Sequence, residues 1–131
     1  MKNFKPLLFL GSFMFALVFS AQAQFSLPNP ADFKKDMMGA MLPGDDLGLS
    51  NKQKDDLKKQ NESFLNDVIE IANGNDSDEG KLSAIKGLAG KNNSALSGIL
   101  GNDKLLKSYR KKIKKQIRPF KTKYKIAKLV L

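Results

Sequence analysis

The residue types that most often carry out catalysis are missing from this 131-residue chain, which contains neither histidine nor cysteine. Histidine and cysteine supply the commonest general base, the usual nucleophile pairs and most zinc ligands. The acidic segment 74–80 (GNDSDEG) is a candidate for calcium. An EF-hand loop counted from Asp76 requires glycine sixth and glutamate twelfth, but these places hold Lys81 and Gly87, and a count from Asn73 also fails. The sequence therefore predicts no enzyme, no metal site and no cofactor.

Basic residues are concentrated at the C-terminal end of the chain. Residues 104–131 hold 12 lysines and arginines and no acid, whereas all 13 acidic residues precede them. Such an end is expected to bind an anionic partner. Because lysine neutralises phosphates without reading bases, we expect an anionic membrane surface or lipopolysaccharide, and no nucleic acid. The alternative is that the apolar positions of this segment pack on the rest of the chain while its lysines face water.

The first 23 residues have the pattern of a signal peptide. Lys2 and Lys5 precede an apolar run over residues 7–19, and an A-x-A pattern ends at Ala23. This run is shorter than the about 20 residues that a transmembrane helix needs. Cleavage after Ala23 leaves 108 of 131 residues, with 21 basic and 13 acidic side chains and a net charge of +8. We expect a periplasmic protein, with an uncleaved N-terminal membrane anchor as the alternative.

Hydrophobic periodicity predicts an all-helical chain, with long helices over about residues 50–73, 77–100 and 103–118. Residues 24–46 are expected to form an arm outside the core, with a short helix that Pro30 opens. Its methionines and phenylalanines would pack on the domain or on a subunit, or would grip an unfolded client. Residues 119–131 form a basic tail, whose alternating pattern favours a strand or an extended arm, with helical continuation as the alternative.

Polar residues at two kinds of position are expected to organise the helices. Ser50 is a good N-cap, and Gln53 lies three residues later, where its side chain can return to the cap N–H group. Asp76 and Glu79 repeat this spacing before the next helix. Asn61 and Asn92 each interrupt an apolar stripe, and they would lie at similar heights of two antiparallel helices. We hypothesise that they face each other and fix the register of the two helices. The alternative places both at stripe edges, where they meet only water.

The stretch Leu49-Ser50-Asn51-Lys52-Gln53 fits an L-[T/S]-x-x-Q motif at the head of a long polar helix. This arrangement resembles the Spy/CpxP family of small periplasmic helical stress proteins, over residues 47–118. The resemblance implies an elongated antiparallel helical hairpin, with additional N- and C-terminal helices, that forms a homodimeric cradle. The second motif site of the family departs from the pattern, since it reads LGNDK over residues 100–104.

Two functional hypotheses follow. The first is an ATP-independent chaperone or envelope-stress adaptor, whose partners are unfolded or partly folded envelope proteins or a stress-sensor domain. It would hold them on apolar stripes rimmed by lysine and arginine, and the candidate contact residues are Phe64, Leu96, Tyr109, Ile113, Lys111, Lys114 and Lys115. The second is a peripheral envelope protein that binds anionic lipid or lipopolysaccharide through its basic C-terminal helix.

Overall fold

The computed structural model describes residues 25–130, and this part of the chain is all-helical and contains no strand. The predicted all-α class is therefore confirmed. The proposed signal peptide, residues 1–23, lies outside the described residues. In chain order the elements are α2 (Pro30–Met41), the 3-10 helix η1 (Asp45–Leu47), α3 (Asn51–Ala72), α4 (Asp78–Leu100), α5 (Asp103–Ile117), α6 (Phe120–Lys123) and the 3-10 helix η2 (Lys125–Leu129).

The long helices begin where the sequence provides polar caps. Ser50 caps α3 and Asn102 caps α5, each through a side-chain oxygen that accepts a backbone N–H three residues later. The expected Asp76–Glu79 pair does not cap α4, so this prediction is wrong. Ser77 is the cap instead, because its Oγ accepts the N–H of Gly80 at 3.2 Å. Helix α4 ends at Gly101, whose φ of 79° suits a residue without a side chain.

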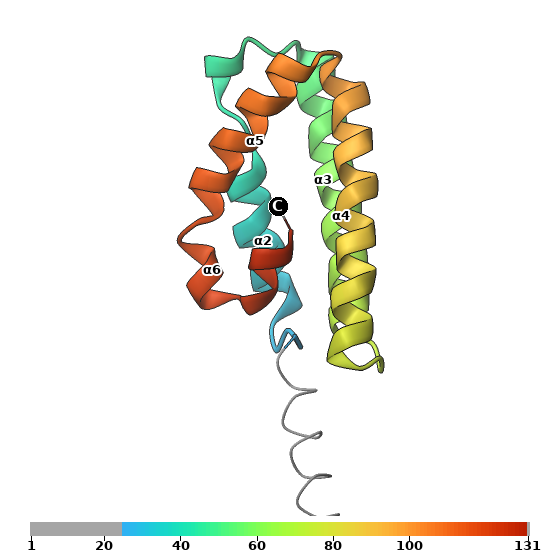
Figure 1. The fold of residues 1–131 in the computed structure, drawn as a ribbon. Coiled ribbons are helices and arrows are strands. Elements are labelled where there is room, and N and C mark those ends of the chain that lie inside the picture. Colours follow the sequence, from blue (N-terminus) through green and yellow to red (C-terminus); the bar gives the residue numbers. More distant parts are fainter. Residues whose placement is uncertain (1–24, 131) are drawn as a thin grey trace, which may run out of the picture.

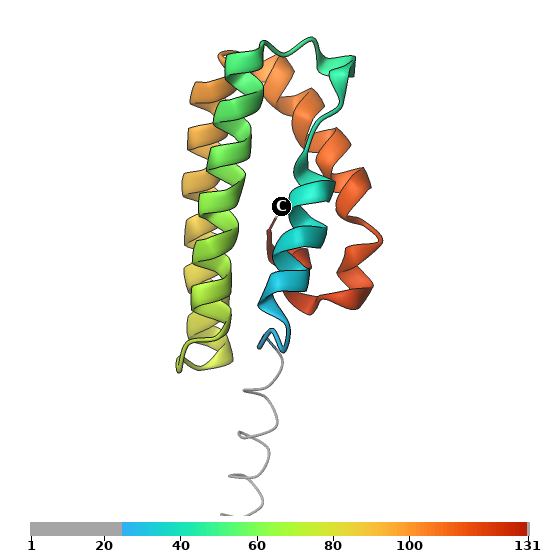
Figure 2. The ribbon, with the colours of Figure 1, turned by 180° about the vertical axis from the view of Figure 1, so that it is seen from behind.

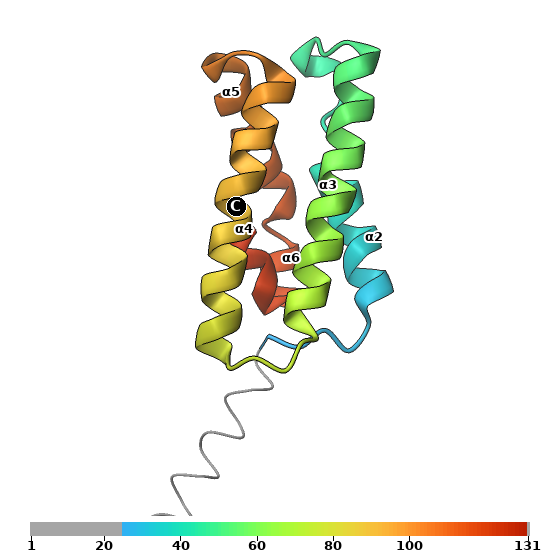
Figure 3. The ribbon, with the colours of Figure 1, turned by 90° about the vertical axis from the view of Figure 1, so that its right-hand side faces the viewer.

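Four helices form two layers. Helices α3 and α4 lie side by side, and α2 and α5 lie beside this pair in a second layer (Figures 1 and 3). Contacts join α2 to α3, α2 to α5 and α4 to α5, so each of the four helices touches two others. The view from behind shows α5 leaving the upper end of the α3–α4 pair and running down past α2 (Figure 2). The apolar face of the α3–α4 pair is therefore covered by the second layer.

Helix α2 belongs to the core, so the expectation of an N-terminal arm outside the core is wrong. Phe33 and Met37 have no exposed surface, and Met41 is 1% exposed. These three side chains recur at four-residue steps and thus lie on one face of the helix. The Phe33 ring also meets the Tyr124 ring edge to face, with 5.1 Å between centroids. The side chains that were expected to pack on the domain therefore do so.

The C-terminal segment is helical rather than extended. Helix α5 ends just before Arg118 and Pro119, and the chain then forms α6 and η2. Ile126, Ala127 and Val130 are buried, and η2 packs against α4. A strand would need a neighbouring strand for its N–H and C=O groups, and the described residues provide none. The segment therefore folds back and closes the interior between the two layers.

Candidate functional site

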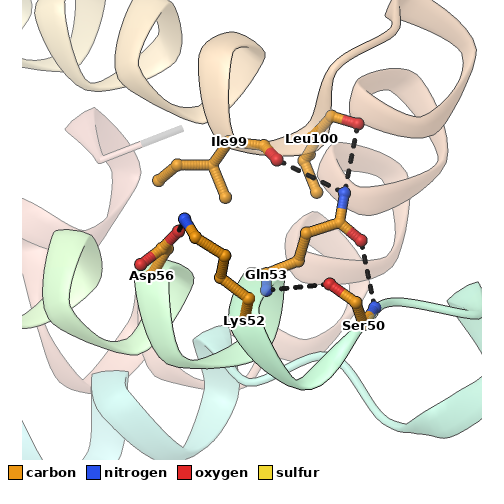
Figure 4. Close-up of polar contacts among 6 residues, drawn as sticks. All are labelled: Ser50, Lys52, Gln53, Asp56, Ile99 and Leu100. Atoms are coloured by element: carbon orange, nitrogen blue, oxygen red, sulfur yellow. Dashed lines mark hydrogen bonds and ion pairs between the residues drawn. The ribbon is translucent and has the colours of Figure 1, made fainter.

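The Ser50–Gln53 motif is a structural clamp between two helices (Figure 4). The Ser50 N–H donates to Gln53 Oε1 at 3.0 Å, and the Gln53 N–H donates to Ser50 Oγ at 3.1 Å, which completes a capping box. Gln53 Nε2 then donates to the carbonyl oxygens of Ile99 and Leu100 at 3.3 and 3.4 Å. One side chain thus joins the start of α3 to the end of α4. Leu49 before it is buried, at 8% exposed.

The two asparagines do not pair with each other, so the hypothesis of an Asn61–Asn92 contact is wrong. Asn61 is fully buried, and its Nδ2 donates to the hydroxyl of Tyr109 at 3.1 Å. That hydroxyl donates to the carbonyl oxygen of Met41 at 3.2 Å. Asn92 accepts a hydrogen bond from Gln60 Nε2 at 3.0 Å instead. Each asparagine lies inside the structure rather than in water, and Asn61 links α2, α3 and α5 through one polar cluster.

Burial raises the pKa of the Tyr109 phenol above its usual value, and the hydrogen bond from Asn61 opposes this shift. The phenol is therefore neutral in the range where proteins are ordinarily studied. It acts as a hydrogen-bond donor and acceptor inside the core.

The four apolar residues expected to contact a client are not on the surface, so this prediction is wrong for the described fold. Ile113 is fully buried, and Phe64, Leu96 and Tyr109 are each 1% exposed. Phe64 and Leu96 come from the first layer, Tyr109 and Ile113 come from α5 of the second, and all four belong to one buried core. Among residues 25–130 the one exposed large hydrophobic side chain is Leu42, at 42%. No open apolar stripe remains on this part of the chain.

The basic contact residues, in contrast, are exposed together on one face of α5. At 100° per residue, six of its cationic side chains fall within an arc of about 100°. We call this set the cationic face; it consists of Lys104, Lys107, Lys111, Lys114, Lys115 and Arg118, all exposed. The opposite face of α5 carries Tyr109, Ile113 and Ile117, which are buried. Packing of the apolar stripe thus holds the lysines outward, as the alternative interpretation of the sequence proposed.

No member of the cationic face forms an ion pair within residues 25–130. Neighbouring lysines do: Lys112 pairs with Asp46 of η1, and Lys123 pairs with Asp36 of α2 at 2.8 Å. The bond from Lys112 lowers the pKa of Asp46 below its usual value. The bonds from Lys123 and Tyr124 likewise lower the pKa of Asp36. Lysines that stabilise the fold are thus distinct from those that remain available to a partner.

Three acidic residues lie close together in sequence at another part of the molecule. The loop between α3 and α4 and the first turn of α4 hold Asp76, Asp78 and Glu79. This loop lies at the end of the α3–α4 pair that is opposite to the junction with α5 (Figure 1). This acidic loop is therefore distant from the start of α5, whereas two other carboxylates, Asp46 and Asp103, lie beside or on that helix.

Sequence reasoning missed Lys81, a buried polar residue that stabilises the end of α3. Its Nζ donates to the carbonyl oxygen of Ala72 at 2.8 Å, and the residue is 4% exposed. A lysine in this place satisfies a C-terminal carbonyl of a helix and favours its dipole. The signal was present in the sequence, because Lys81 shares a helical face with Ile85 and Asn92 at steps of four and seven residues.

The described residues contain no group of three or more acidic residues, histidines or cysteines placed to hold a metal ion. Within the same part of the chain, no helix has both the length and the apolar character to cross a membrane. Fold and site together define an all-helical, two-layer protein with a cationic face. The chain matches no protein-family model, no curated protein and no solved structure.

Proposed function

We propose that this protein is an exported, peripheral binding protein that attaches to an anionic lipid surface through the cationic face of α5. The observation that carries the proposal is the set of six exposed cations without ion pairs on one side of a single helix. In a folded protein of mixed charge, basic side chains commonly have acidic neighbours. From residue 104 onward the sequence has no acid, and the carboxylate that α5 itself carries is that of Asp103 in its first turn.

The attachment would be electrostatic and would not involve insertion into the bilayer. Amphipathic helices that enter a membrane do so with an exposed apolar face. The apolar face of α5 instead packs inside the protein. Basic residues close to an anionic leaflet contribute about 1 kcal/mol each, so six contribute about 6 kcal/mol at low salt. That free energy corresponds to about a 10⁴-fold preference for the surface.

Export supplies the compartment of the proposed surface. A cleavable signal peptide ending at Ala23 would deliver the protein to the periplasm. There it would face anionic phospholipid headgroups or lipopolysaccharide. Detection of the N-terminus at Gln24 in protein purified from the envelope would support this part of the proposal, whereas an intact Met1 would contradict it.

The proposal is tested by co-sedimentation of the protein with phosphatidylcholine vesicles that contain or lack phosphatidylglycerol. We expect binding only to the anionic vesicles, with loss at high salt, because the screening length falls from about 10 Å at 0.1 M to about 3 Å at 1 M. The variant Lys111→Gln/Lys114→Gln/Lys115→Gln should bind about 100-fold more weakly, since three contacts of about 1 kcal/mol each are removed.

A matched control separates the cationic face from net charge. Lys58 and Lys59 of α3 and Lys86 of α4 are also exposed and have no ion pair among the described residues. Their triple substitution by glutamine removes the same charge from another surface. Equal loss of vesicle binding in the two triple variants would show that net charge alone is responsible and would refute a site on α5.

A second candidate keeps the chaperone or stress-adaptor function that the Spy/CpxP resemblance suggests. One observation favours it: the apolar interior is closed by the C-terminal segment, which Asp36 holds through Lys123 and Tyr124. Release of that segment would uncover Leu96, which lines the same hollow as Val130. Suppression of client aggregation at near-stoichiometric ratio would support this candidate, and no suppression with several unrelated clients would oppose it. The homodimer is part of this candidate and is tested by the mass in solution.

A further inference from the structure

Arg110 lies beside the cationic face and differs from its members in being half-buried. Within residues 25–130 its guanidinium has neither a carboxylate partner nor a hydrogen bond. Its five donors reach water, since none of the guanidinium nitrogens is both buried and unpaired, and an acceptor can therefore approach them. A partly buried arginine without an acceptor is therefore available for an anionic ligand.

Arg110 lines a hollow of about 580 Å³ at the start of α5. The other residues that line it are Asp103, Lys104, Leu106 and Lys107. Three cations and one exposed carboxylate leave the hollow with a net positive charge. A phosphate group suits this set, because arginine binds two phosphate oxygens with its planar fork while lysines add point charges.

Arg110 also lines a second hollow of about 260 Å³, between α4 and the C-terminal segment. Asn93 of α4 contributes its amide there, and the Oδ1 of this amide is buried without a hydrogen-bond partner. Unpaired acceptors of this kind call for a donor. An amide that no hydrogen bond holds can turn toward a hydroxyl group placed in the hollow. The remaining wall includes the apolar side chains Leu96 and Val130.

We propose that these two hollows form a binding site for the phosphate ester of a small polyol. Arg110, Lys104 and Lys107 hold the phosphate, and Asn93 accepts a hydrogen bond from a hydroxyl group of the ligand. Glycerol phosphate has this chemistry, both as the headgroup of phosphatidylglycerol and as a free molecule. The proposal rests on the proposed function for its lipid source, and it adds recognition of one headgroup to attraction by charge.

The test is an NMR titration of the folded full-length protein with glycerol 3-phosphate, inorganic phosphate and glycerol. We expect saturable binding of glycerol 3-phosphate that is tighter than that of either fragment. Arg110→Lys keeps the charge and removes the fork, so it should weaken binding about tenfold, which corresponds to one charged hydrogen bond. Asn93→Ala should weaken the binding of glycerol 3-phosphate but not that of inorganic phosphate. Lys58→Gln/Lys59→Gln, on α3 and outside the cationic face, should leave both nearly unchanged.

Vesicles of equal surface charge distinguish the two sources of the ligand. Preference for phosphatidylglycerol over phosphatidylserine, lost in Arg110→Lys, assigns the site to the lipid headgroup. Binding of free glycerol 3-phosphate without that preference assigns it to a soluble ligand. The site is refuted if glycerol 3-phosphate does not saturate, if Arg110→Lys and Lys58→Gln/Lys59→Gln weaken it equally, or if Asn93→Ala affects both phosphates alike. Vesicle binding that still depends on Lys111, Lys114 and Lys115 would then leave the proposed function intact.

Discussion

Replacement of Gln53 by glutamate distinguishes between two roles of this residue, the capping of α3 and the hydrogen bonds that link α3 to α4. Glutamate at the third helical position is a standard capping-box residue, and its negative charge favours a helix N-terminus. For α3 alone the change Q53E is therefore expected to be neutral or stabilising by a few tenths of a kcal/mol. In the folded protein, Gln53 Nε2 also donates to Ile99 O and Leu100 O. The variant would place a carboxylate oxygen against two carbonyl oxygens.

The magnitude follows from these contacts. Two bonds of 3.3 and 3.4 Å are lost, and two partly buried carbonyl groups lose their donor. A typical net hydrogen bond is worth about 1 kcal/mol, and a buried group left unsatisfied costs a similar amount or more, so we expect a loss of about 2–3 kcal/mol. For a domain of this size that loss lowers the melting temperature by about 8–12 °C. Ser50→Ala, which removes the cap alone, should cost about 1 kcal/mol.

Thermal unfolding followed by far-UV circular dichroism at neutral pH measures the effect. Asn51→Asp is the matched control, because it introduces the same carboxylate at the exposed first residue of α3. The control should be neutral or slightly stabilising. Near pH 4, where carboxyl groups begin to protonate, the introduced acid regains a donor, so the deficit of Q53E relative to the native protein should shrink. A Q53E protein as stable at neutral pH as the native one would refute the clamp.

Three further tests probe the core and its closure. Tyr109→Phe should lower the free energy of unfolding by about 1–2 kcal/mol, because it removes the bridge between Asn61 and α2; denaturant titration measures this loss. Asn61→Ala and Asn92→Ala should add within about 0.5 kcal/mol in a double-mutant cycle, since they share no hydrogen bond, and a larger coupling would contradict the observed partners. The lowered pKa of Asp36 means that its bonds to the C-terminal segment stabilise the fold above the usual value of 3.8 and are lost as pH falls through the lowered pKa. As the pH falls from about 5 to about 2, the near-ultraviolet circular dichroism signal of Tyr124 should decrease in the native protein. This decrease should be smaller in Asp36→Asn. A decrease of the same size in the variant would exclude Asp36 as its cause.

Local signals in the sequence were sufficient for the three long helices and for the cap of α3. Ser50 with Gln53 marks the start of α3, and a cap depends on atoms within four residues. The separation of charge was also evident from the sequence, because residues 104–131 contain no acid. Helical periodicity even indicated which side of α5 would be apolar, and the structure buries Tyr109 and Ile113 on that side.

The contacts between residues that are far apart in the sequence were determined by the tertiary structure. The sequence could not show that Gln53 reaches α4 or that Asn61 bonds Tyr109, because these contacts join residues 46–48 positions apart. It also could not show that η2 closes the interior. An apolar stripe has the same pattern whether a client, a subunit or the chain's own end covers it, because hydrophobic burial is non-directional. The packing of the whole chain determines which of these three covers the stripe. In this protein it buries Leu96 and leaves the lysines of the cationic face exposed.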